Sequence, residues 1–143
     1  MTTKTFADRI HNMNRMYALP CHTLPTLPEN SVERLSKFKK TLLDEIHEVN
    51  EIIINIEDGV QNIDALTLIA DWLGDITVYA RSEAMKYGIP LEHVINIIMD
   101  SNESKLGEDG RPIYDENGKF LKGPRYWKPE GKIKQLLLGD GED

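Results

Sequence analysis

Two aspartates that lie four residues apart are the first side chains in this sequence whose placement suggests chemistry. Asp71 and Asp75 are the only charged residues in an otherwise apolar or small window, residues 65–80 (ALTLIADWLGDITVYA). Positions i and i+4 of a helix share one face, so both carboxylates are expected to point the same way from a segment that reads as buried core. Unpaired carboxylates in apolar surroundings are costly, and the usual remedies are a raised pKa, a cationic partner or a bound metal ion. We therefore expect a cation to face them.

The chain around this window is strongly acidic. Between residues 44 and 75 there are nine Asp or Glu residues and no Lys or Arg. Glu45 and Glu48 lie three residues apart on the preceding helical segment, and antiparallel packing of the two segments would bring four carboxylates together. Such clusters of oxygen ligands suit hard cations, above all Mg²⁺ or Mn²⁺. The alternative for Glu45 and Glu48 is a solvated helix face, because exposed acids are common on helices.

Helical periodicity of the apolar residues predicts the elements that position these acids. Four helices are expected, over residues 5–17, 30–58 and 62–87 and from Pro90 through Met99. Asn30 and Glu33 have the spacing of a capping box at the start of the second helix, and Gly88 is suited to end the third. The fold class predicted is all-α, of the four-helix-bundle type.

The composition changes after residue 101, where Gly, Pro and charged residues become frequent. Residues 112–121 have the pattern of a small β-hairpin, and residues 132–138 that of a short closing helix. Eight basic residues lie between positions 105 and 134, so the positive charge missing from the middle is concentrated here. We expect one domain over residues 1–143, with a helical core of about 3–106 and an extension over 107–143.

Composition also limits the function classes. The formal net charge of −7 argues against a nucleic-acid partner, which would require a basic face. The single cysteine, Cys21, excludes an internal disulfide and fits a reducing compartment. The sequence has neither a signal-peptide pattern nor a long apolar run, so we expect a cytoplasmic protein with no membrane partner.

The acidic residues occur in a recognisable pattern. Residues 44–48 (DEIHE) followed by 71–75 (DWLGD) resemble the E-E-x-x-E and E-x-x-D signature of the all-alpha nucleoside triphosphate pyrophosphohydrolases, which include the MazG-like and phosphoribosyl-ATP pyrophosphohydrolase proteins. Residues 101–124, with SNESKL, DG, GK and LKGP, resemble the tail of a small MazG-like subgroup. Two positions depart from the signature. Trp72 stands where E-x-x-D has its Glu, so that the fourth acid is Asp71, and Asp44 replaces the first Glu.

The resemblance implies hydrolysis of a nucleoside triphosphate between its α- and β-phosphates, which yields a monophosphate and pyrophosphate. It implies that Mg²⁺ or Mn²⁺ is held by the acids of the signature, and it makes Asp44 a candidate base that orients the attacking water. Asn102, Lys105 and Lys122 are candidate substrate-binding residues. The predicted metal ligands are Glu45, Glu48, Asp71 and Asp75. Activity on phosphoribosyl-ATP is an alternative, and no residue in the sequence selects the base or sugar.

Two further classes remain open. Asp44 and His47 have the i,i+3 spacing used by di-iron carboxylate bundles, with Asp8 and His11 as the second such pair. A helical interaction module without chemistry would have to pair its carboxylates with distant bases. In either case the apolar excess at residues 52–56 predicts a homo-oligomer, a dimer or a tetramer, which the resemblance also implies.

Overall fold

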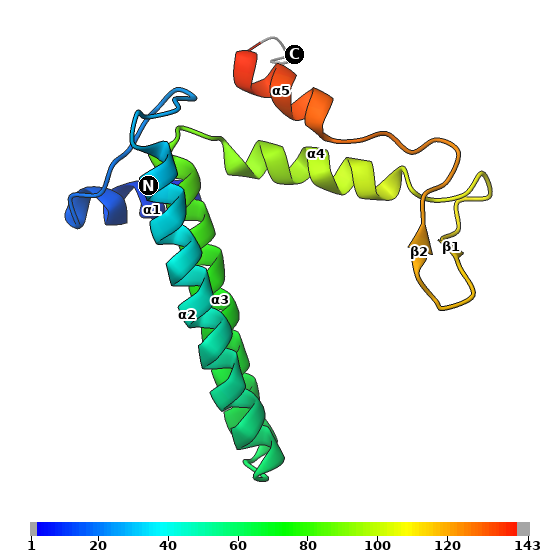
Figure 1. Ribbon diagram of the computed structural model, residues 1–143, viewed down its shortest axis with the longest axis horizontal. Helices are drawn as coiled ribbons and strands as arrows, with labels where there is room; N and C mark the ends of the chain where they lie inside the picture. Colours follow the sequence, from blue (N-terminus) through cyan, green and yellow to red (C-terminus); the bar gives the residue numbers. More distant parts are fainter. Residues whose placement is uncertain (1–2, 140–143) are drawn as a thin grey trace. The chain divides into compact units, whose positions relative to one another are not determined.

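The computed structural model of the chain describes residues 3–139 and is predominantly helical (Figure 1). Its elements, in order, are α1 (Phe6–Met16), α2 (Ser31–Glu57), α3 (Asn62–Lys86), α4 (Leu91–Glu103), β1 (Ile113–Tyr114), β2 (Phe120–Leu121) and α5 (Glu130–Leu138). The described strands form only a two-residue antiparallel ribbon. The all-α fold class, the four principal helices, the hairpin and the closing helix are therefore confirmed.

The chain divides into two compact units, residues 1–89 and 90–143. This boundary falls before α4, whereas the predicted extension begins at residue 107 and its last four residues lie outside the described part. A single domain can contain two such units, so the one-domain organisation stays a prediction. Each unit is described separately below.

The first unit is built on a long antiparallel pair of helices, α2 and α3, which lie side by side in Figure 1. The turn between them follows the Asp58-Gly59 pair, where Gly59 adopts the positive φ of 89° that glycine tolerates well. The predicted capping box at the start of α2 is wrong: the Asn30 side chain makes no cap hydrogen bond and its Oδ1 instead accepts from Arg34 Nε at 3.0 Å. The capping box lies on α1, between Thr5 and Asp8.

Helix α1 packs on α3 through a buried polar contact. Asn14 is fully buried; its Nδ2 donates to the backbone oxygen of Ser82 at 3.3 Å, and its Oδ1 accepts from Ser82 Oγ at 2.7 Å. Both groups of the amide are thus satisfied, as burial demands. Ile10, one turn earlier on α1, supplies an apolar contribution to the same core.

The proline-rich connector between α1 and α2 is hydrogen-bonded to the C-terminal end of α3. The backbone N–H of His22 donates to Met85 O at 3.0 Å, and that of Thr26 donates to Tyr87 O at 2.8 Å. Gly88 has a φ of 66°, and a Cβ there would collide with the backbone of Leu24. Gly88 therefore ends α3 in the left-handed conformation predicted for it. Because it has no side chain, it also allows the connector to pack closely against the end of α3.

The second unit contains α4, the β1–β2 hairpin and α5. Ser101, buried on α4, donates from Oγ to Trp127 O at 2.9 Å, while Ser104 Oγ accepts from Trp127 N at 3.2 Å. The N–H of Gly123 donates to Lys105 O at 2.7 Å, in a place where a Cβ would collide with the backbone of Leu106. These contacts close the loop that carries the hairpin. Among the described helices of both units, none has the length and apolarity needed to cross a membrane.

Candidate functional site

The predicted acidic site lies on the facing sides of α2 and α3. Glu45 on α2 is 6% exposed, and its backbone oxygen accepts a hydrogen bond of 2.8 Å from Trp72 Nε1 on α3. Trp72 thus contributes a structural contact at the position where the signature has a Glu. The Glu45 carboxylate is consequently held against α3 and away from bulk solvent.

Two of the other predicted ligands, Glu48 and Asp75, act on this carboxylate through their charges. Burial raises the pKa of Glu45 above its ordinary value, and the negative charges of Glu48 and Asp75 raise it further. The Glu45 Oε2 atom is buried and has no hydrogen-bond partner within residues 3–139. An unpaired carboxylate oxygen beside two other acids is the arrangement that a cation would stabilise.

Tyr79 is a site residue that the sequence reasoning missed. Its pKa is raised by burial and by the charges of Glu45, Asp75 and Glu48, so the hydroxyl keeps its proton at neutral pH. The Tyr79 hydroxyl lies within hydrogen-bonding reach of the Glu45 carboxylate. This hydrogen bond acts to lower the pKa of Glu45. The sequence spacing could have identified it, because Tyr79 follows Asp75 by four residues and so shares its helix face.

Asp71 and Asp44 have different surroundings from these three acids. Both side chains are exposed, as is that of Glu48, but the carboxylate charges that act on Glu45 are those of Glu48 and Asp75. Leu66 and Leu73 on the same segment are exposed as well, so the predicted burial of the window at 65–80 is wrong for this single chain. The metal role of Asp71 and the base role of Asp44 remain predictions.

The contacts of the aspartates bear on the two alternatives, an interaction module without chemistry and a di-iron site. Within residues 3–139, neither Asp71 nor Asp75 forms an ion pair with a Lys or Arg, which is what an interaction module without chemistry would need. In the second di-iron pair, Asp8 accepts a hydrogen bond from Thr5 N at 2.9 Å in the α1 cap.

The candidate donors around Glu45 are all carboxylate oxygens. In the described part of the chain, no group of three or more His, Cys, Asp or Glu side chains is arranged so that it could hold a metal ion. Carboxylates that repel one another are expected to stay apart until an ion draws them in. The unpartnered Glu45 Oε2 and the all-oxygen chemistry of Glu45, Glu48 and Asp75 fit Mg²⁺ or Mn²⁺.

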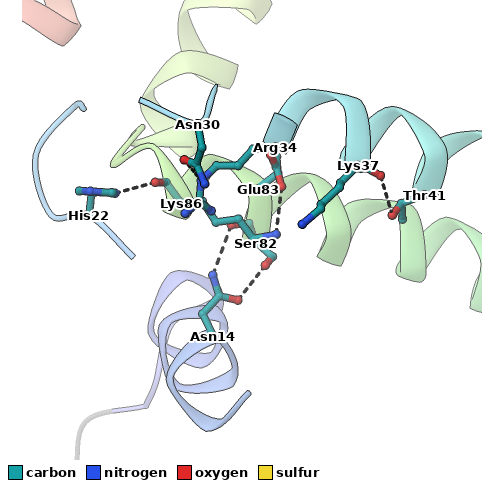
Figure 2. Close-up of polar contacts among 9 residues, drawn as sticks. All are labelled: Asn14, His22, Asn30, Arg34, Lys37, Thr41, Ser82, Glu83 and Lys86. Carbon is teal, nitrogen blue, oxygen red and sulfur yellow. Dashed lines mark hydrogen bonds and ion pairs between the residues drawn. The ribbon is translucent and has the colours of Figure 1, made fainter. Parts of the chain in front are cut away.

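A pocket of about 530 Å³ adjoins this acidic site inside the first unit. Its walls come from α1, the connector, α2 and α3, and include Pro20, Arg34, Phe38, Thr41, Tyr79 and Glu83. Tyr79 belongs to the pocket wall and also contacts Glu45, so it joins the pocket to the acids. Figure 2 shows the polar side chains of this region, with cationic groups from Arg34 and Lys86 near Glu83. The pocket has both apolar and charged walls, as a nucleotide requires.

The predicted substrate-binding residues lie in the second unit. Lys105 Nζ and Lys122 Nζ lie 5.9 and 5.1 Å from the centre of the Tyr126 ring. The structure therefore brings these two lysines together, and two ammonium groups around one ring form a local positive charge. Asn102 is exposed on α4. Their contact with substrate remains a prediction.

No protein-family profile and no curated protein matches the sequence. The fold is similar to that of a solved protein from Exiguobacterium sp. 255-15, named "a putative NTP pyrophosphohydrolase", with a TM-score of 0.54 over 96% of each chain. The two sequences are 16% identical, so this similarity shows the fold alone. The chain has a mostly helical fold of that kind.

Proposed function

We propose that this protein is a metal-dependent nucleoside triphosphate pyrophosphohydrolase, which cleaves a (d)NTP-like substrate to a monophosphate and pyrophosphate. The observation that carries this proposal is the buried carboxylate of Glu45, which has an unpartnered oxygen and is acted on by the charges of Glu48 and Asp75. Tyr79, which contacts this carboxylate, also lines a pocket of about 530 Å³. The fold similarity supports the same class of activity at a coarse level.

In this proposal the metal ligands are Glu45, Glu48 and Asp75, and the exposed Asp71 is a weaker candidate. A bound Mg²⁺ or Mn²⁺ would neutralise phosphate charge and lower the pKa of a bound water. Asp44 is assigned to orienting that water.

The other residues of the proposed site either position a metal ligand or bind the substrate. Tyr79 keeps its proton and holds the Glu45 carboxylate in place, because the acids around it raise its pKa. Lys105 and Lys122 are assigned to the phosphates, with Asn102 beside them on α4. The pocket next to Tyr79 receives the nucleoside part of the substrate.

A panel of nucleotides tests this function. Pyrophosphate release is measured for the common (d)NTPs and for phosphoribosyl-ATP with Mg²⁺, and again with excess EDTA. We expect release from at least one substrate, and its loss with EDTA. Phosphoribosyl-ATP as the preferred substrate would favour the alternative activity. Undiminished release in EDTA would contradict the metal assignment.

A pair of variants on α2 tests the site itself. Glu48→Gln removes one proposed ligand charge, whereas Glu51→Gln changes an exposed acid three residues further on. We expect Glu48→Gln to abolish Mg²⁺-dependent release and Glu51→Gln to retain it. Equal activity of the two variants would contradict the proposed site.

A further inference from the structure

Helix α2 carries an exposed stripe of residues that the proposed chemistry does not use. Its positions are spaced alternately by four and three residues, so they share one face of the helix. All six are exposed in the first unit: Lys39, Leu43, Ile46, Asn50, Ile53 and Glu57. The pocket takes its α2 wall from other positions, among them Arg34, Phe38 and Thr41. We call the six exposed residues the α2 stripe.

Helix α3 has a matching stripe on the same side of the helix pair. Its large apolar side chains are between 52% and 66% exposed: Ile63, Leu66 and Leu73. Ile46 directly follows Glu45, which is buried against α3, and Leu73 directly follows Trp72, which contacts α2. One residue turns a helix by about 100°, and an equal rotation carries both helices of an antiparallel pair to the same side. The two stripes therefore form one exposed apolar surface, which is typical of an interaction site.

The two ends of the α2 stripe carry opposite charges. Within residues 3–139, neither Lys39 nor Glu57 forms an ion pair. Leu43 and Ile53 lie at equal distances from the centre of the stripe, as Lys39 and Glu57 do. A second α2 stripe running in the opposite direction would therefore place apolar residues beside apolar residues and each charge beside its opposite. Such complementary charges fix the register of an interface.

The charge of the whole α2–α3 pair has the same polarity. Residues 44–75, which include the turn, have nine acids and no Lys or Arg, whereas residues 31–43 and 76–86 together have six Lys or Arg and two Glu. A second pair running in the opposite direction brings the acidic end of each copy to the basic end of the other. A second pair running in the same direction brings the two acidic ends together, which like charges oppose.

Helix α4 of the same chain is less suited to this surface. It has exposed apolar side chains of its own, Ile95, Ile98 and Met99, but it carries three acids and no Lys or Arg. Its charge would oppose contact with the acidic end of the α2–α3 pair. A second copy supplies both an apolar surface and a basic end.

We propose that the α2 and α3 stripes are the surface on which a second copy of this chain docks, with its α2–α3 pair antiparallel and the partner's Glu57 beside Lys39. A two-fold axis then relates the copies, so every contact occurs twice. This inference goes beyond the proposed hydrolysis and does not depend on it, because the stripes contain no residue of the proposed site.

An exchange of charge between the ends of the α2 stripe tests this arrangement. Lys39→Glu places like charges side by side at two points of the dimer, and so does Glu57→Lys. We expect each variant to raise the dimer Kd, measured by analytical ultracentrifugation, by at least about tenfold. An equimolar mixture of the two variants restores opposite charges in the mixed dimer, as the double variant does in its own, so both should associate within a few-fold of the unmodified protein. Lys40→Glu, the same charge change outside the stripe, is the control and should have a smaller effect than Lys39→Glu.

Three results would overturn the inference. The first is a monomeric unmodified protein at micromolar concentration, which is expected if α4 covers the surface. The second is a Kd that the single variants leave unchanged, and the third is a weakened association that neither the mixture nor the double variant restores.

A disulfide test replaces the charge exchange if circular dichroism shows that a charge variant does not fold. Leu43→Cys and Ile53→Cys are made in a protein whose single cysteine is removed by Cys21→Ser. In the proposed dimer, oxidation of their mixture links the two variants. Leu43→Cys alone should stay unlinked, because its two copies are about 15 Å apart along the axis, beyond the reach of a disulfide. A link within Leu43→Cys alone, or no link in the mixture, would overturn the antiparallel arrangement.

Discussion

The indole Nε1 of Trp72 donates a 2.8 Å hydrogen bond to the backbone oxygen of Glu45. This bond joins α3 to α2 at the level of the acidic site and fixes the position of Glu45 relative to Asp75. The indole of Trp72 therefore contacts the backbone of Glu45, which is one of the proposed metal ligands.

Trp72→Phe removes the donor and keeps most of the apolar contact. We expect the free energy of unfolding to fall by about 1 kcal/mol, because the net value of one hydrogen bond is of that order. Turnover should fall as well, since Glu45 is no longer held. Urea unfolding and pyrophosphate release measure the two effects, and unchanged values for both would contradict the positioning role.

Asp75→Asn keeps the shape of the side chain and removes its charge. We expect it to abolish Mg²⁺-dependent turnover and to leave the fold intact, or slightly more stable without metal, because repulsion of Glu45 is relieved. Asp64→Asn, an exposed change near the start of α3, is the matched control and should retain activity. Full activity of Asp75→Asn would remove the basis of the mechanism.

The raised pKa of Glu45 predicts how stability depends on pH. The ordinary value is 4.5, and burial together with the charge of Glu48 raises the pKa in the folded protein. Between 4.5 and the raised pKa the folded chain binds more protons than the unfolded chain, so the free energy of unfolding falls as the pH rises through this window. Urea unfolding in EDTA from pH 4.5 to neutral pH measures this slope. Glu45→Gln should flatten it, and an unaltered slope would show that another group is responsible.

Gly88→Ala should destabilise the first unit. Its φ of 66° is unfavourable for alanine, and the added Cβ would collide with the backbone of Leu24 in the connector. We expect a loss of at least about 1 kcal/mol in the free energy of unfolding. Nucleotide affinity should fall too, because Pro20 of the same connector lines the pocket. Gly131→Ala, in open space on α5, serves as the control and should be neutral or stabilising.

The exposed apolar side chains of the α2–α3 pair predict self-association. Ile53, Ile54 and Ile56 on α2 are between 45% and 55% exposed, and Leu66 on α3 is 60% exposed. We expect a homodimer or homotetramer in solution, which light scattering at micromolar concentration would detect. Ile54→Glu should lower the mass, whereas the neighbouring exposed change Asn55→Glu should not. A monomeric unmodified protein would contradict the prediction.

Local sequence patterns were sufficient to predict the helices and the hairpin of this fold. The helix boundaries followed from apolar periodicity, from Gly59 and Gly88 and from Pro90, because each of these acts within a few residues. The hairpin at 113–121 followed from its turn residues for the same reason. The pattern of acids at 45, 48, 71 and 75 predicted a metal site, and that assignment stays a prediction.

The tertiary structure decided which of these residues lie near one another. Sequence spacing placed Asp71 and Asp75 on one helix face, but the packing of α2 against α3 brought Glu45 to Asp75 and left Asp71 exposed. The unpartnered oxygen of Glu45 could not be predicted either. Whether a carboxylate is buried and unpaired depends on the rotation of each helix and on the segments that cover it, and those contacts join residues far apart in the chain.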